Sequence, residues 1–95
     1  MDSKGGPERA KPCCEAGVMR SGGRSIRLRI FDLSAEGCKI EFVERPSVGE
    51  RIWVKFDGLE SMAGIVRWTA GDIGGIAFEQ PMDAAGFRQL ANRGS

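Results

Sequence analysis

The stretch that decides the fold is Ile26–Phe42, IRLRIFDLSAEGCKIEF, in which two alternating segments flank the polar segment Asp32-Leu33-Ser34-Ala35-Glu36-Gly37. On each side of that segment every second residue is apolar and the residues between are mostly charged. This period of two is typical of strands that bury one face. The apolar positions are Ile26, Leu28, Ile30, Cys38, Ile40 and Phe42.

The same rhythm continues along the chain in both directions. A segment before Ile26 is joined to it by Ser21-Gly22-Gly23, which favours a hairpin turn. Later strands are separated by turn-forming residues at 45–49, 57–58 and 71–72. The predicted strands are 13–19, 26–30, 38–42, 52–56, 62–68 and 75–78. About six short strands in this order favour an antiparallel barrel or sandwich, with an all-β fold class.

The two ends of the chain differ from this pattern. Residues 1–11 contain Gly, Lys, Ser and Pro without periodicity, and we expect a flexible N-terminal arm. After Pro81 the pattern changes to helical spacing, with Asp83 as the expected cap. One face of this helix carries Phe87, Leu90 and Ala91, and we expect it to plug one barrel end or cover an edge. The predicted domain is therefore 12–93.

Composition narrows the classes of function. The chain has 95 residues, a formal net charge of +1, no histidine and three cysteines. The near-neutral charge argues against a nucleic-acid polymer as partner. The start is polar and no apolar run reaches membrane-spanning length, so we expect a cytoplasmic protein without membrane insertion. Without histidine, a paired nucleophile and base or a cofactor loop, we expect no enzyme and no metal site.

The polar segment allows two interpretations. Asp32, Ser34 and Gly37 are typical of a structural turn, because their side chains bond backbone groups and glycine accepts positive φ. Alternatively, Asp32 accepts hydrogen bonds from a base edge such as that of guanine, and Ser34 donates to a phosphate. Both interpretations stay open from the residues alone.

Aromatic and sulfur-bearing side chains are the other candidates. Trp68 stacks on a base in one interpretation, although packing in the core is the commoner role of tryptophan. Trp53 falls on the polar face of its strand, so it is expected to be exposed or under the helix. Adjacent Cys13 and Cys14 point to opposite faces if both lie in a strand, which is poor geometry for one metal ion. We interpret these two and Cys38 as small hydrophobes.

Taken together, these segments resemble the PilZ domain family from about Arg9 to Phe78, and the helix after Pro81 also fits. The family pattern includes RxxxR in an N-terminal loop and (D/N)xSxxG after a hairpin, which Asp32–Gly37 matches fully. The later strands resemble Gly64-Ile65-Val66-Arg67-Trp68 and Gly75-Ile76-Ala77-Phe78. The resemblance implies a six-stranded antiparallel β-barrel of split-barrel type with a C-terminal α-helix.

The resemblance also implies a ligand and a partner. Domains of this family bind cyclic di-GMP and change the surface presented to an effector protein. If the chain is such a receptor, we expect Arg9, Asp32, Ser34 and Gly37 to form the ligand site, with Lys11 and Trp68 assisting.

The arm departs from the family pattern, because Cys13 stands where the second arginine of RxxxR is expected. Lysine at 11 does not replace a stacked, bidentate arginine. A literal RxxxR at Arg20–Arg24 falls on the hairpin tip, and we interpret it as a coincidence. Two hypotheses follow: a cyclic di-GMP receptor module, or a degenerate domain that does not bind this ligand and acts as a protein–protein adaptor.

Overall fold

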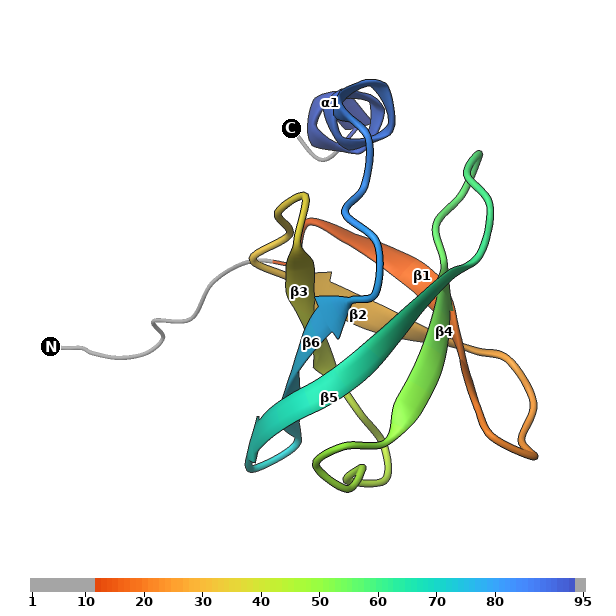
Figure 1. The fold of residues 1–95 in the computed structure, drawn as a ribbon, viewed down its shortest axis with the longest axis vertical. Helices are drawn as coiled ribbons and strands as arrows, with labels where there is room; N and C mark the ends of the chain where they lie inside the picture. Colours follow the sequence, from red (N-terminus) through yellow and green to blue (C-terminus); the bar gives the residue numbers. More distant parts are fainter. Residues whose placement is uncertain (1–11, 94–95) are drawn as a thin grey trace, which may run out of the picture.

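The computed structural model describes residues 12–93, which form a closed six-stranded barrel and one helix (Figure 1). Every neighbouring pair of strands is antiparallel, in the order β1-β2-β3-β6-β5-β4, and β4 pairs with β1 to close the barrel. The elements are β1 (Cys14–Arg20), β2 (Ile26–Phe31), β3 (Gly37–Glu41), β4 (Arg51–Lys55), β5 (Met62–Ala70), β6 (Ile73–Phe78) and α1 (Ala84–Arg93). The predicted antiparallel barrel with a C-terminal helix is confirmed.

The alternation seen in the sequence produces the core. In β2, Leu28 and Ile30 are buried, whereas Arg27 and Arg29 between them are exposed. The largest fully buried side chains come from β1 to β5 and include Phe56, which directly follows β4. Burial of such side chains contributes about 1.5–3 kcal/mol each to stability, which makes the barrel interior the main source of cohesion.

The helix covers one end of this barrel. In Figure 1, α1 lies beyond the end that carries the β2–β3 and β4–β5 loops. Leu90 and the preceding Met82 belong to the buried core, and Phe87 packs against it. The Asp83 carboxylate accepts a hydrogen bond from the Gly86 amide at 2.7 Å, so Asp83 caps the helix as predicted. Of the two expected placements, at a barrel end or over a sheet edge, the structure shows the first, because α1 lies over one end of the barrel.

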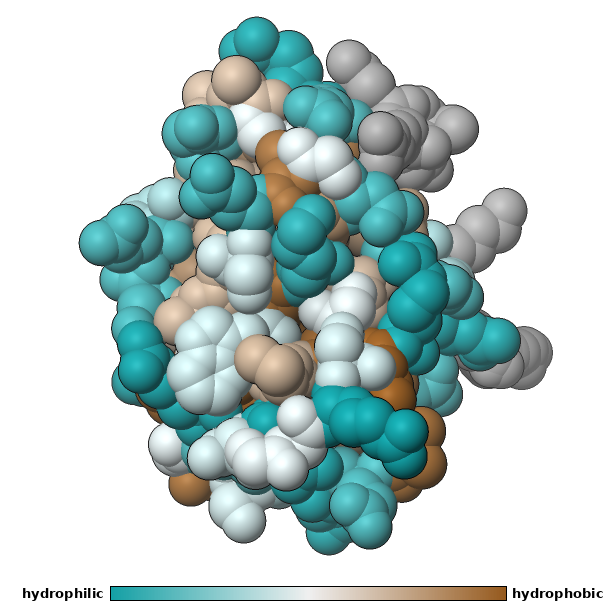
Figure 2. Space-filling model, turned by 90° about the vertical axis from the view of Figure 1, so that its right-hand side faces the viewer, coloured by the Kyte–Doolittle hydropathy of each residue, from teal (hydrophilic) through white to brown (hydrophobic). Residues whose placement is uncertain are grey.

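Trp53 of β4 lies on the outer face of the barrel, beside β1. Trp53 is half-buried and lies opposite Met19 in β1 and Ala63 in β5. The guanidinium of Arg51 lies 5.3 Å from the centre of a Trp53 ring and also pairs with Glu79 at 2.7 Å. Figure 2 views the molecule from this side, where hydrophilic side chains are spread over the face and brown shows between them. Within residues 12–93, no helix has the length and apolar run needed to cross a membrane.

Arg20 holds two connections together at the barrel end opposite α1. Its guanidinium donates to both carboxylate oxygens of Glu50, at 2.7 and 3.1 Å, and to the carbonyl oxygen of Glu44 at 2.9 Å. The same carboxylate accepts the amide of Ser47 at 3.1 Å. These bonds tie the β1–β2 hairpin to the β3–β4 connection, so Arg20 already has a structural role.

The Arg20–Glu50 pair makes the free energy of unfolding depend on pH in the acid range. The hydrogen bond from Arg20 lowers the pKa of Glu50 below its ordinary value. The contribution is therefore complete above that ordinary pKa and is lost as the pH falls through the lowered one. Glu50→Gln should reduce the free energy of unfolding by about 1 kcal/mol near neutral pH. Urea unfolding followed by tryptophan fluorescence measures this loss.

In acid below the lowered pKa, Glu50→Gln and the unmodified chain should converge in stability. The matched control is Glu44→Gln, since Arg20 bonds the Glu44 backbone carbonyl rather than its side chain. A loss from Glu50→Gln that is equal at neutral and acid pH would contradict the assignment.

Candidate functional site

The β2–β3 loop is a tight turn built by its own side chains. Asp32 has φ of +49°, in the left-handed region that aspartate and asparagine tolerate better than most residues. The Ser34 amide donates to the Gly37 carbonyl oxygen at 2.8 Å. The Ser34 hydroxyl donates to the same oxygen at 3.3 Å and accepts the Glu36 amide at 3.3 Å. Ser34 therefore has a structural role in this turn.

Gly37 is required by the approach of β3 to β6. A Cβ at this position would collide with the carbonyl oxygen of Ile76 and lie 3.3 Å from the Cα of Ala77. Both neighbours are backbone atoms of a central strand, so neither can move aside cheaply. Gly37 therefore serves the packing of the barrel, whatever binds beside it.

A bulge in β5 places Trp68 on the outer surface. Val66 lies opposite Ile76, but Trp68 lies opposite Gly75, so Arg67 is an extra residue in the ladder. Strict alternation would put Trp68 on the same inward face as Val66, which is fully buried. The extra residue reverses the alternation, and Trp68 is 41% exposed. Core packing, the commoner role considered for Trp68, is wrong for this reason.

The indole of Trp68 lies over Gly75. A Cβ on Gly75 would collide with the indole nitrogen and its neighbouring carbon, so the absence of a side chain lets the ring lie against the sheet. On the other side of Gly75, Lys39 of β3 occupies the next position across the sheet. Its ammonium nitrogen lies 5.8 Å from the centre of the Trp68 ring, within range of a cation–π attraction.

Lys39 also connects Trp68 to the β2–β3 loop. Its nitrogen lies 2.8 Å from a carboxylate oxygen of Asp32, and both side chains are about half exposed. Such a surface pair contributes about 0–1 kcal/mol to stability, so its partners can exchange it for a ligand at low cost. Asp32, Lys39 and Trp68 thus present an acceptor, a cation and an aromatic face side by side.

These three residues are shared by two adjoining hollows, which we call the Trp68 surface. The larger hollow, about 530 Å³, extends over β2, β3, β5 and β6 and includes Phe31 and Pro12. The smaller, about 330 Å³, extends over the loop to Ser34 and Gly37. Pro12, the first residue that the structure describes, therefore forms part of the wall at the point where the N-terminal segment meets the barrel.

The structure brings together four of the residues predicted for the site: Asp32, Ser34, Gly37 and Trp68. Arg9 and Lys11, the other two, lie outside the described residues. Sequence reasoning missed Lys39, because its role depends on the register between β3 and β6. It also missed Phe31 and Arg67, which line the larger and smaller hollow respectively.

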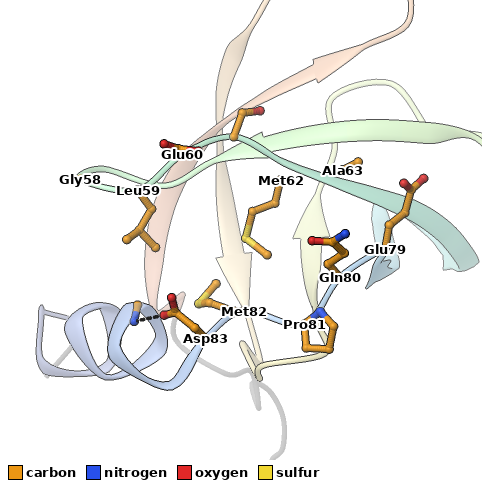
Figure 3. A pocket seen from close by; sticks show the side chains of 12 residues that line it. Gly58, Leu59, Glu60, Met62, Ala63, Glu79, Gln80, Pro81, Met82 and Asp83 are labelled. Carbon is orange, nitrogen blue, oxygen red and sulfur yellow. Dashed lines mark hydrogen bonds between the residues drawn. The ribbon is translucent and has the colours of Figure 1, made fainter.

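A larger hollow of about 650 Å³ lies elsewhere, between the β4–β5 loop and the segment that leads into α1 (Figure 3). Its side chains include two methionines, Met62 and Met82, and the carboxylates of Glu60, Glu79 and Asp83. None of the four predicted site residues that the structure describes lines it. Among residues 12–93, its lining contains three carboxylates and no cation, which is unfavourable for a phosphate.

Two hydrogen bonds connect the loop of the Trp68 surface to this second region. The carbonyl oxygen of Glu36 accepts the amide of Phe78 at 2.8 Å, and that of Ala35 accepts the amide of Met82, also at 2.8 Å. Met82 in turn is buried next to the start of α1. These bonds therefore join the β2–β3 loop directly to the segment that leads into α1.

The role assigned to Gly37 can be tested by adding one methyl group. Gly37→Ala should lower the free energy of unfolding by about 2 kcal/mol, because the methyl group meets a backbone oxygen of β6. Urea unfolding measures the loss. Gly23→Ala is the matched control. A Cβ added at Gly23 would lie 3.4 Å from its nearest neighbour, the Arg20 carbonyl oxygen, and the φ of Gly23 is not in the left-handed region. Equal losses in the two variants would show that β3 and β6 are not in close contact at Gly37.

Comparison with known proteins agrees with this architecture. The model of the PilZ domain family matches residues 8–93, nearly the whole chain. No curated protein and no solved structure gives a significant match. The matched range includes the β2–β3 loop, the bulged β5 and the helix. The chain belongs to the PilZ domain family of cyclic di-GMP-binding receptor and adaptor domains.

Proposed function

We propose that this chain is a bacterial, cytoplasmic receptor module that binds cyclic di-GMP on the Trp68 surface and relays binding to an effector protein. The observation that carries the proposal is the position of Trp68. The β5 bulge and Gly75 together leave an indole face accessible beside Lys39 and Asp32. A purine base stacks on such a face with a free energy of about 1–3 kcal/mol.

Three side chains each recognise a different part of the ligand. Trp68 stacks on one guanine, and the Asp32 carboxylate accepts hydrogen bonds from the donors on the guanine edge. Lys39, released from Asp32 by this exchange, turns to a phosphate. In this exchange the Lys39 ammonium pairs with a phosphate, and the Asp32 carboxylate keeps hydrogen-bond donors from the neutral guanine edge, so both charged groups keep a hydrogen-bond partner.

Further cations are needed because the ligand carries two phosphates. Arg29 lies in the larger hollow but is 3.7 Å from Glu41, so its charge is partly compensated. Arg67 lies in the smaller hollow, and no ion pair joins it to another residue in the range 12–93. We assign the remaining phosphate contacts to Arg9, which the family resemblance places in the site, with Lys11 assisting as a nearby positive charge.

Ser34 contributes in a more limited way. Its hydroxyl hydrogen is directed to the Gly37 carbonyl oxygen at 3.3 Å, a long bond that a phosphate oxygen can replace by rotation of the hydroxyl. The amide of Ser34 keeps the loop in place through its own bond to Gly37 at 2.8 Å. Ligand binding can therefore use Ser34 without unfolding the turn.

Relay to the effector follows the backbone bonds of the loop. A ligand held by Asp32 and Ser34 pulls on the segment whose carbonyl groups bind Phe78 and Met82. The effector then recognises the altered position of α1. In the degenerate alternative, the same barrel contacts its partner without ligand.

Trp68 provides a direct binding signal. The chain has two tryptophans, so Trp53→Phe leaves Trp68 as the one fluorophore of this type. Addition of cyclic di-GMP to Trp53→Phe should quench this fluorescence. In the unmodified chain, Trp68→Ala should weaken binding measured by calorimetry about tenfold, since one stacked base is lost. Trp53→Phe should bind like the unmodified chain.

A titration of isotope-labelled protein with cyclic di-GMP, followed by NMR, decides between the receptor and the degenerate domain. The absence of amide shifts near Asp32 and Ser34 at millimolar cyclic di-GMP would rule out the receptor and support the adaptor. A parallel titration with GTP measures specificity for the cyclic dinucleotide.

Asp32 can be tested without disturbing its unusual backbone. Asparagine also tolerates positive φ, so Asp32→Asn removes the charge and keeps the turn. This variant should bind cyclic di-GMP about tenfold more weakly, because a charge-assisted hydrogen bond contributes about 1.5–3 kcal/mol. Glu60→Gln, an exposed carboxylate on the other hollow, is the matched control and should bind normally. Normal binding by Asp32→Asn would exclude contact between this carboxylate and the ligand.

A further inference from the structure

The sulfur atoms of the adjacent cysteines Cys13 and Cys14 lie close together at the start of β1. Cys13 Sγ and Cys14 Sγ are 3.2 Å apart, in hydrogen-bond contact. The expectation that the two side chains point to opposite faces is wrong, because β1 begins at Cys14 and Cys13 does not follow strand alternation. Cys13 is nevertheless fixed in place, since its amide donates to the Ile30 carbonyl oxygen at 2.8 Å.

The two thiols are accessible and have no further ligand group. Both side chains are half-buried and pack against the edge of the core, so a small reagent reaches them. In the part of the chain that the structure describes, no group of three or more His, Cys, Asp or Glu residues is arranged to hold a metal ion. The pair therefore fits a two-thiol reaction better than metal coordination.

We propose that Cys13 and Cys14 are an oxidation site, which a hydroperoxide converts to a disulfide between adjacent residues. The Cys13 thiolate attacks one peroxide oxygen, the O–O bond breaks, and water or an alcohol leaves. The resulting sulfenic acid is then attacked by the Cys14 sulfur, the S–O bond breaks, and the Cys14 proton leaves with the hydroxide as water. Two electrons from the sulfurs reduce the peroxide, so no other reductant is needed.

The environment of each sulfur supports this order of steps. Burial and, to a lesser extent, the hydrogen bond with Cys13 together raise the pKa of the Cys14 thiol to about 12. Cys14 therefore remains protonated near neutral pH. The raised pKa therefore argues against Cys14 as the first nucleophile. In the second step the 3.2 Å separation of the two sulfurs compensates for the low thiolate fraction of Cys14, which loses its proton as it attacks the oxidised Cys13.

Cys38 serves as the internal control. It is 6% exposed on the inward face of β3, and burial raises the pKa of its thiol. A buried thiol with a raised pKa reacts slowly with peroxide, because the thiolate is the nucleophile.

The location links oxidation to the neighbouring surface. Pro12, the residue before the pair, forms part of the wall of the Trp68 surface, and Ile30, which holds Cys13, precedes Phe31 of the same wall. A disulfide between adjacent residues requires a new backbone arrangement around Cys13, and that arrangement repositions Pro12. The oxidation itself does not depend on any ligand of the Trp68 surface.

A peptide map of the full chain tests the proposal. Trypsin cleaves after Arg9 and Arg20 but not between Lys11 and Pro12, so one peptide, residues 10–20, carries both cysteines. Cys38 falls in a separate peptide, residues 30–39. After limiting hydrogen peroxide and alkylation, peptide 10–20 should have lost two hydrogen atoms and resist alkylation, whereas peptide 30–39 should be alkylated.

Three results would overturn the assignment. They are a cross-link between peptides 10–20 and 30–39, a cross-link between two chains on a non-reducing gel, and a sulfinic acid on Cys13 without disulfide. Variants add a second line of evidence. Cys14→Ser should accumulate a sulfenic acid on Cys13 that dimedone traps, and Cys13→Ser should slow oxidation about tenfold. Cys38→Ala should leave the rate unchanged.

Discussion

The pair of glycines near the start of β6, Gly74 and Gly75, is the constraint on which both the core and the surface site depend. Gly74 faces inward, where a Cβ would lie 2.8 Å from the ring of Phe42, so its absence lets that ring complete the barrel interior. Gly75 faces outward and leaves the same kind of space for Trp68. Two adjacent residues thus set the packing density on one face of the strand and the aromatic platform on the other.

Much of the architecture could be predicted because it follows from short-range patterns. The alternation around Ile30 and Ile40, the glycine turns and the cap at Asp83 are local features that tertiary contacts reinforce. The errors arose where one residue breaks the local period. The bulge at Arg67 reverses the face of Trp68, and Cys13 lies one residue before its strand begins. Lys39 could not be assigned to the site, because strand register is a property of the pairing and not of either strand.

The motif Asp32–Gly37 contains residues that serve folding as well as residues proposed to bind a ligand. Gly37 is needed for the contact with β6, and Ser34 holds the turn through its amide and hydroxyl. A chain can therefore keep both residues for folding alone, even if it binds no nucleotide. Asp32 differs, because its carboxylate points to Lys39 rather than into the loop. Asp32 and Trp68 consequently distinguish a binding domain from a purely structural one better than the motif as a whole.

Closure of the barrel by the β1–β4 pairing has a consequence for how an effector protein is recognised. Within residues 12–93, each of the six strands has a partner on both sides for at least part of its length, so no strand is an open edge from end to end. An added strand of the proposed effector therefore has at most a short segment to pair with. The proposed recognition depends mainly on side chains of the loops and of α1. Two closely related domains with the same barrel can therefore choose different partners through a few surface substitutions, without any change to the fold.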